Sequence, residues 1–155
     1  MTAARILAAA FAAGLLLATP AAAMAPTPAA ESATADMDYV RAVELIDERR
    51  YPEAVTLLRL VVNRNPENAD AWSRLGYAAR KSGDREKGEL YYGKALALDP
   101  AHRATMEYLG EMYLESGRPE LARTMLDKLV KLCPDGCEAR AKLEAAIAAD
   151  AAKKQ

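Results

Sequence analysis

The sequence predicts an all-α fold, an α-solenoid of three helix-turn-helix repeats followed by a C-terminal capping helix. The composition is rich in Ala, Leu and Glu, which favour helices. A Leu-Gly pair recurs after 34 residues, at Leu75-Gly76 and Leu109-Gly110, and a proline closes each unit. Apolar residues recur at helical spacing between these markers. These features indicate stacked helix pairs from residue 36 to residue 155.

Four helices are expected in the first two units, over residues 37–48, 52–64, 69–81 and 85–98. Pro52 fits the first turn of the second helix, where its missing N–H costs nothing. Asp84 precedes the fourth helix and is a suitable N-cap. Gly76 and Gly88 are small enough to let the two helices of the second unit approach closely.

Three more helices are expected over residues 103–115, 119–132 and 136–151. Pro119 fits the first turn of the sixth helix. Asp135 is expected to cap the last helix, in which Ala139, Leu143 and Ile147 form an apolar stripe. This helix should cover the exposed side of the third unit. The units end at Pro66, Pro100 and Pro134, because a proline restricts the residue before it away from helix.

The charge balance excludes some classes of function. The 155 residues include 21 Lys or Arg and 22 Asp or Glu, which gives a formal net charge of −1. Binding to nucleic acid requires an excess or a cluster of basic residues, which this balance does not provide. One His and two Cys leave little with which to build a catalytic or metal site. We therefore expect no enzyme, no cofactor and no nucleic-acid partner.

The N-terminal segment predicts export. Residues 1–23 have a basic start at Arg5, an apolar run over 6–18 and small residues before a cleavage point near Ala23, which is typical of a signal peptide. The run of 13 residues is shorter than the roughly 20 that span a membrane, although an uncleaved anchor remains the alternative. Residues 24–35 have no apolar periodicity and predict a disordered linker. We expect a periplasmic or secreted protein without a membrane span after cleavage.

The repeat units carry a characteristic set of residues. In the middle unit these are Trp72, Leu75-Gly76, Gly83, Gly88, Tyr92, Ala95 and Pro100. The third unit retains Leu109-Gly110, Tyr113, Gly117, Ala122 and Pro134, whereas the first is strong only in its second half. Over residues 35–134 the chain resembles the tetratricopeptide repeat (TPR) family, as a small exported bacterial member. The resemblance implies repeats at about 35–68, 69–102 and 103–136, stacked into a right-handed superhelix.

The resemblance also implies a concave groove, lined by the first helix of each pair, that binds a peptide or helix of another protein. The corresponding residues are Tyr39, Val43, Ser73, Tyr77, Arg80, Lys81, Glu107 and Glu111. They lack the Lys and Asn set with which some members grip a C-terminal carboxylate. The function implied is an adaptor, scaffold or assembly factor for an unidentified envelope or periplasmic protein. The alternative is that these charges form a solvated face and the tyrosines merely pack.

The two cysteines flank a Pro-Asp-Gly turn. This turn allows Cys133 and Cys137 to reach the Cα separation of roughly 4.4–6.8 Å that a disulfide requires, and export makes a disulfide the expected state. The alternative function is a thiol-redox or copper-handling factor, because Cys137 lies in the first turn of a helix, which favours thiolate. His102 is interpreted as an exposed turn residue, since no clustered metal ligands accompany it.

Overall fold

The computed structural model describes residues 28–153, with side chains from residue 37 onward, so the predicted signal peptide lies outside the described residues. The described region forms seven α-helices and no strand, which confirms the all-α prediction. In chain order the helices are α1 Pro28–Asp47, α2 Tyr51–Arg64, α3 Ala69–Lys81, α4 Arg85–Leu98, α5 Arg103–Glu115, α6 Pro119–Leu132 and α7 Glu138–Ala152.

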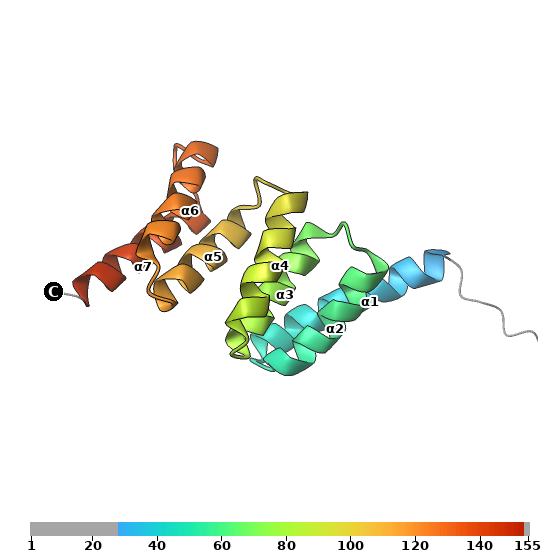
Figure 1. The fold of residues 1–155 in the computed structure, drawn as a ribbon. Helices are drawn as coiled ribbons and strands as arrows, with labels where there is room; N and C mark the ends of the chain where they lie inside the picture. The colour runs from blue at the N-terminus through green and yellow to red at the C-terminus, as the bar shows by residue number, and fades with distance from the viewer. Residues whose placement is uncertain (1–27, 154–155) are drawn as a thin grey trace, which may run out of the picture.

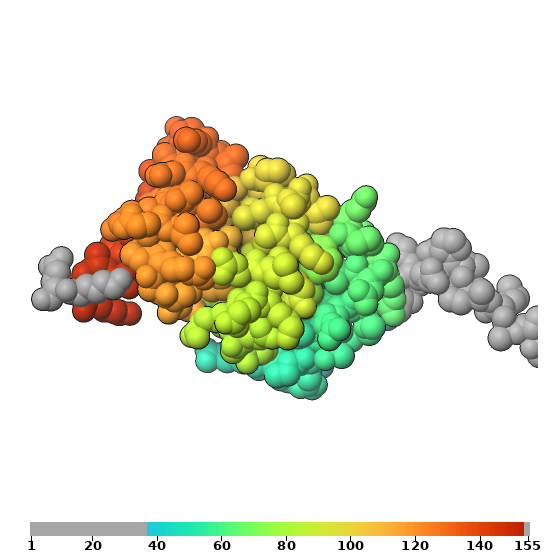
Figure 2. Space-filling view, in the orientation of Figure 1, coloured from blue at the N-terminus to red at the C-terminus, as the bar shows by residue number. Residues whose placement is uncertain are grey.

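The helices form an array that runs from α1 at one end to α7 at the other (Figure 1). Successive helices pack in pairs, α1 with α2, α3 with α4 and α5 with α6, and each pair contacts the next. The space-filling view shows the same order along the molecule (Figure 2). The last helix, α7, packs on both α5 and α6. The predicted solenoid of three helix pairs and a capping helix is confirmed.

Local sequence signals place most helix ends correctly. Pro52 and Pro119 lie in the first turns of α2 and α6. Asp84 is the N-cap of α4, and its Oδ1 accepts a hydrogen bond from the main-chain N–H of Lys87 at 3.1 Å. Gly117, between α5 and α6, has a φ of +70°, a conformation that glycine adopts without strain. Capping and turn residues therefore define these boundaries.

The start of α1 differs from the prediction. The helix begins at Pro28 instead of residue 37, so residues 28–35 of the predicted disordered linker are helical. Ala is the strongest helix former, and proline is favoured in the first turn of a helix. This Ala-rich segment therefore continues the helix even though its sequence has no apolar periodicity.

The start of α7 also differs from the prediction. Its N-cap is Cys137 rather than Asp135, and the helix begins at Glu138 instead of residue 136. Gly136 has a φ of +100°, which a right-handed helix does not contain. The helix can therefore begin only after this glycine.

The buried apolar side chains form two clusters. The first comes from α1, α2 and α3 and contains Ala42, Leu45, Ile46, Ala54, Leu58, Val61, Val62, Ala71, Leu75 and Ala78. The second contains Tyr92 from α4 and then Met106, Leu109, Met112, Tyr113, Ala122, Met125, Leu129, Ala139 and Leu143. They contain Leu75 and Leu109 of the recurring Leu-Gly pairs and Ala139 and Leu143 of the predicted apolar stripe. No helix in the described part of the chain is long and apolar enough to cross a membrane.

Glycines permit close helix packing at two places. A Cβ on Gly76 of α3 would lie 2.6 Å from the ring of Tyr92 on α4. A Cβ on Gly110 of α5 would also lie 2.6 Å from its neighbour, which is Leu143 of α7. The size requirement predicted for Gly76 is therefore present, but Gly110 makes room for the capping helix.

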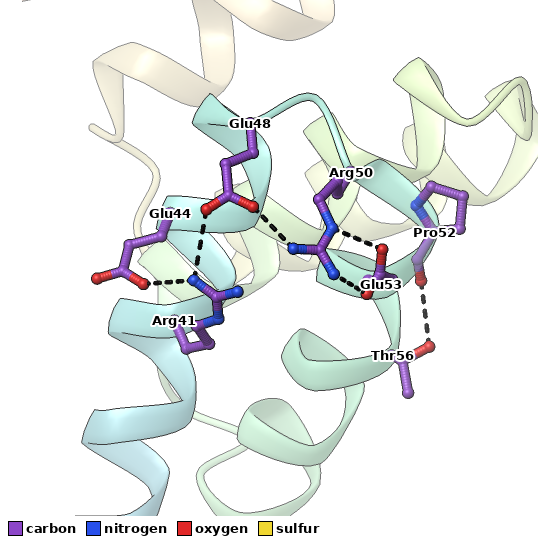
Figure 3. Close-up of polar contacts among 7 residues, drawn as sticks. All are labelled: Arg41, Glu44, Glu48, Arg50, Pro52, Glu53 and Thr56. Carbon is purple, nitrogen blue, oxygen red and sulfur yellow. Dashed lines mark hydrogen bonds and ion pairs between the residues drawn. The ribbon is translucent and has the colours of Figure 1, made fainter.

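The α1 end of the array carries charged side chains that bridge α1 and α2 (Figure 3). Arg41 donates hydrogen bonds to Glu44 at 2.8 Å and to Glu48 at 3.5 Å. Arg50 donates to Glu48 at 2.9 Å and to Glu53 at 2.7 Å. All five side chains are exposed, and such pairs contribute little stability individually. They keep the outer face of the first repeat compatible with water.

Candidate functional site

Half-buried tyrosines form a row across the first three repeats. The ring centroids of Tyr51 and Tyr77 are 6.3 Å apart, and those of Tyr77 and Tyr108 are 5.0 Å apart. We call Tyr51, Tyr77 and Tyr108 the tyrosine row. The exposed Lys81 places its Nζ 5.5 Å from the centroid of Tyr77. Of the predicted groove residues on α3, Tyr77 and Lys81 are thus brought together and remain accessible.

The predicted groove residues of α1 lie near this row. Tyr39 and Val43 are both half-buried, and Tyr39 packs against the first apolar cluster. Arg74 of α3 lies near both Tyr39 and Tyr108, and these two side chains help to raise the pKa of its guanidinium. Arg74 therefore connects the α1 side of the surface to the tyrosine row.

Arg80 is buried between α3 and α5, with only 2% of its side chain exposed. Its guanidinium donates hydrogen bonds to Glu111 at 3.0 Å, to Glu115 at 2.6 Å and to the main-chain oxygen of Tyr108 at 2.8 Å. We call Arg80, Glu111 and Glu115 the arginine clamp. Its hydrogen bonds hold the pKa of Glu115 below the usual value. This geometry corrects the prediction for Arg80, which joins two repeats and offers no surface to a partner.

Ser73 and His102 belong to a second network between α3 and α5. His102 is the N-cap of α5, and its Nδ1 accepts a hydrogen bond from the main-chain N–H of Thr105 at 3.2 Å. Its Nε2 lies 2.9 Å from Oδ1 of Asp70. Thr105 Oγ1 donates to the buried Ser73 Oγ at 2.8 Å. Two predictions are corrected here: Ser73 is not accessible, and His102 is a largely buried cap because the helix start requires an acceptor.

A cleft of about 850 Å³ opens between the first turns of α3, α5 and α7. We call it the acidic cleft, because its lining includes five carboxylates but only two Lys or Arg side chains. The carboxylates are Glu67, Asp70, Asp99, Glu107 and Glu138, and the basic residues are Arg103 and Lys142. Tyr108 also lines the cleft. The acidic cleft and the tyrosine row are therefore parts of one surface.

Glu107 is the predicted groove residue that lines the acidic cleft. It is 6% exposed, and no described residue donates a hydrogen bond to its carboxyl group. The ammonium group of Lys142 on α7 lies 3.9 Å from Glu107 Oε1. Burial raises the pKa of Glu107 to about 7, and the charge of Lys142 opposes this rise. Its carboxyl group therefore changes charge near neutral pH.

The structure pairs Cys133 with Cys137, and their Cα atoms are 6.0 Å apart. This separation lies within the range that a disulfide requires. Cys133 is buried at the end of α6. Arg140 of α7 donates hydrogen bonds to the main-chain oxygens of Pro134 at 2.9 Å and of Cys133 at 3.3 Å. The turn thus ties α6 to α7, which forms one wall of the acidic cleft.

Among the residues of this surface that were not predicted as groove residues are Tyr108 and Lys142. The 34-residue period contains a signal for both, because Lys142 follows Tyr108 at that spacing and Leu143 follows Leu109. Helix α7 therefore continues the repeat as a further first helix, and its side chains line the same surface as those of α3 and α5.

The features of this surface are suited to binding. It offers aromatic rings beside an open cleft with negative charge. Among the described residues, no group of three or more His, Cys, Asp or Glu side chains could hold a metal ion.

A family model described as tetratricopeptide repeat matches residues 39–86 and 73–136 of the chain. The peroxisomal targeting signal receptor of Saccharomyces cerevisiae is 33% identical over 76 residues. That match covers 49% of this chain but only 12% of the receptor. The chain therefore corresponds to a small part of this relative.

Several solved structures share the fold. The type III secretion translocator chaperone SycD of Yersinia enterocolitica matches with a TM-score of 0.70 and 16% identity, over 79% of this chain and 95% of that chain. The TPR2B domain of yeast Sti1 matches with a TM-score of 0.70 and 18% identity, over 78% and 98% of the two chains. MamA matches with a TM-score of 0.61 and 20% identity, over 65% and 59%. At these identities the likeness concerns the fold alone.

Proposed function

The chain belongs to the tetratricopeptide repeat family, and on that premise we propose that it is a protein-protein interaction module that binds a segment of a partner protein. The observation that carries the proposal is the single surface that the tyrosine row and the acidic cleft form through Tyr108. Aromatic side chains beside a cleft are favourable anchors for a partner. In this proposal the chain acts as an adaptor, scaffold or assembly factor and performs no catalysis.

Two structural neighbours were solved with peptides or binding partners. SycD was solved with a peptide of the translocator YopD, and the TPR2B domain of Sti1 with pHsp70. These complexes support a peptide-binding role for a chain of the same fold. The partner of this chain must be deduced from its own surface, which combines Tyr77, Lys81 and the acidic cleft.

The proposed location is the periplasm or the extracellular space, after cleavage near Ala23. The signal pattern of residues 1–23 supports this location. The cysteine pair supports it too, because disulfides persist in oxidising compartments. We propose a structural disulfide over the thiol-redox or copper-handling alternative, since Cys133 is buried and exchange requires an accessible thiolate. Thiol counting on the native protein distinguishes the two, because only the alternative leaves reduced cysteines.

Site-specific photo-crosslinking in the native compartment tests the interaction function. A photo-reactive residue replaces Tyr77 in one variant and Leu90 in the control, because Leu90 is 58% exposed on α4 and lies outside both surfaces. Capture of one protein from position 77, but not from position 90, would support the proposal. Equal capture at both positions, or none at position 77, would contradict it.

A further inference from the structure

The carboxyl group of Glu107 combines burial with access to the acidic cleft. Glu107 is 6% exposed and lines the cleft. No described residue donates a hydrogen bond to its carboxyl group. A largely buried carboxylate whose one ion pair is 3.9 Å long is incompletely compensated for the hydration it has lost. The wall of the cleft therefore presents an acceptor that a ligand could satisfy.

Lys142 satisfies this acceptor only in part. Its ammonium group lies 3.9 Å from Glu107 Oε1, which is beyond hydrogen-bond distance, and 2.7 Å from Glu138 Oε1 on its own helix. Its side chain is 52% exposed, so it can move into solvent at little cost in packing. The position of this ammonium group shows that the space beside Glu107 accepts a cation.

The rest of the acidic cleft also favours a cation. Its further carboxylates are Glu67, Asp70 and Asp99, and its one further Lys or Arg is Arg103. The aromatic side chain of Tyr108 lines the same cleft, and cations bind favourably over the face of such a ring. A cleft of one charge sign attracts ligands of the opposite sign and repels those of the same sign.

We infer that the acidic cleft recognises one basic side chain, Lys or Arg, of the partner segment. The basic group donates hydrogen bonds to Glu107, displaces Lys142 toward solvent and lies against Tyr108. The neighbouring residues of the segment continue along the tyrosine row toward Tyr77. This inference rests on the proposed function and specifies the chemistry of the partner.

The titration of Glu107 gives the site a second measurable property. Burial, together with the charges of Glu111 and Glu138, raises its pKa to about 7 against the opposing charges of Lys142 and Arg80. A bound cation favours the ionised carboxylate. Affinity for a basic side chain should therefore fall as the pH decreases from 8 to 6.

The test uses two short peptides and the purified protein. One is acetyl-Gly-Gly-Arg-Gly-Gly-amide, and the other has citrulline in place of arginine, which keeps the shape and removes the charge. In nitrogen-15 NMR titrations, only the arginine peptide should shift amide signals in the first turns of α5 and α7. Glu107→Gln should weaken its binding about tenfold, because a charge-assisted hydrogen bond is lost. The matched control Glu86→Gln lies on α4 outside the cleft and should leave the affinity unchanged.

A second variant changes the affinity in the opposite direction. Lys142→Met removes the intramolecular cation, so the arginine peptide should bind about two- to fivefold more tightly. Thermal melting verifies that each variant is folded. Equal binding of the two peptides, or unchanged affinity in a folded Glu107→Gln variant, would overturn the inference. If position 77 still captured a partner in that case, the interaction function would stand without a basic-side-chain site.

Discussion

The junction between the first and second repeats and the junction between the second and third have different residues at the same repeat position. Ile46 of α1 and Arg80 of α3 stand 34 residues apart, and both are buried. Ile46 belongs to the first apolar cluster. Arg80 instead donates hydrogen bonds to Glu111, to Glu115 and to the main chain of Tyr108. The first junction thus depends on apolar burial, which has no directional preference, and the second on directional polar contacts.

The difference shows how the proposed binding surface is positioned. A buried ion pair adds little net stability compared with apolar side chains of similar volume. Its hydrogen bonds do restrict orientation, and one of them holds the main chain of Tyr108. Since Tyr108 belongs to both the tyrosine row and the acidic cleft, the arginine clamp sets the geometry between the two parts of the surface.

The largest effect on stability is expected from removing α7. This helix packs on α5 and α6 and forms a third junction, which is apolar. Truncation after Pro134 would remove Leu143 from Gly110 and expose the second cluster. Loss of this burial should cost about 4 kcal/mol and lower the melting temperature by about 10 °C or more, or cause aggregation. Circular dichroism melting measures it, with truncation after Lys153 as the control that retains α7. Unchanged melting of the shorter chain would show that α7 is not a structural cap.

The next largest effect should come from neutralising both acids of the arginine clamp. The double variant Glu111→Gln, Glu115→Gln leaves the charge of Arg80 buried without its counter-charges. Both acids are partly exposed, so we expect a loss of about 2 kcal/mol rather than the full value for a buried pair. Urea denaturation measures this change, with Glu86→Gln as the control outside the clamp. A loss no larger than that of the control would mean that the clamp does not stabilise the second junction.

Converting the second junction into the first should have a smaller effect. Arg80→Ile places the residue of the first junction at the same repeat position and removes the buried charge together with its hydrogen bonds. We expect a loss of about 1 kcal/mol, because apolar burial offsets most of the lost polar contacts. Urea denaturation gives the stability. The amide signals around Tyr108 in nitrogen-15 NMR spectra should shift, since its main-chain oxygen loses its donor. If Arg80→Ile lost more stability than the double Gln variant, an apolar residue could not replace the polar contacts of the second junction.

Most helix boundaries could be predicted because their signals are local. Pro52, Asp84 and Pro119 act within one turn of their own positions. The burial of Arg80 could not be predicted in the same way, because its partners lie 31 and 35 residues along the chain. In the sequence these three charges look like a solvated surface, and only the approach of α5 to α3 brings them together.

The same reason explains why the proposed binding surface could be predicted only in part. Glu107 could be identified from its repeat position. The opposite wall of the acidic cleft depends on how closely α7 approaches α5, which is determined by the contact of Leu143 with Gly110. That approach brings Lys142 to within 3.9 Å of Glu107. The charge of the cleft is therefore a property of tertiary packing.

The smallest effect on stability is expected from a substitution at Glu107. Its equivalent in the preceding repeat is Ser73, 34 residues earlier. Ser73 receives a hydrogen bond from Thr105, whereas Glu107 receives none from the described residues. Because burial raises the pKa of Glu107 to about 7 in the folded state, the stability linked to its proton is complete below about pH 4.5 and is lost as the pH rises through 7.

Glu107→Gln removes this titration. At pH 8 the variant should be more stable than the unmodified protein by roughly 1 kcal/mol, because the unmodified protein must keep a buried charge and the new amide finds few partners. At pH 5 both carry a neutral side chain, so their unfolding free energies should agree. Urea denaturation at the two pH values measures the difference. An equal difference in unfolding free energy at both pH values would show that the carboxyl group of Glu107 is already ionised at pH 5. The acidic cleft would then solvate Glu107 as effectively as the hydrogen bond from Thr105 satisfies Ser73.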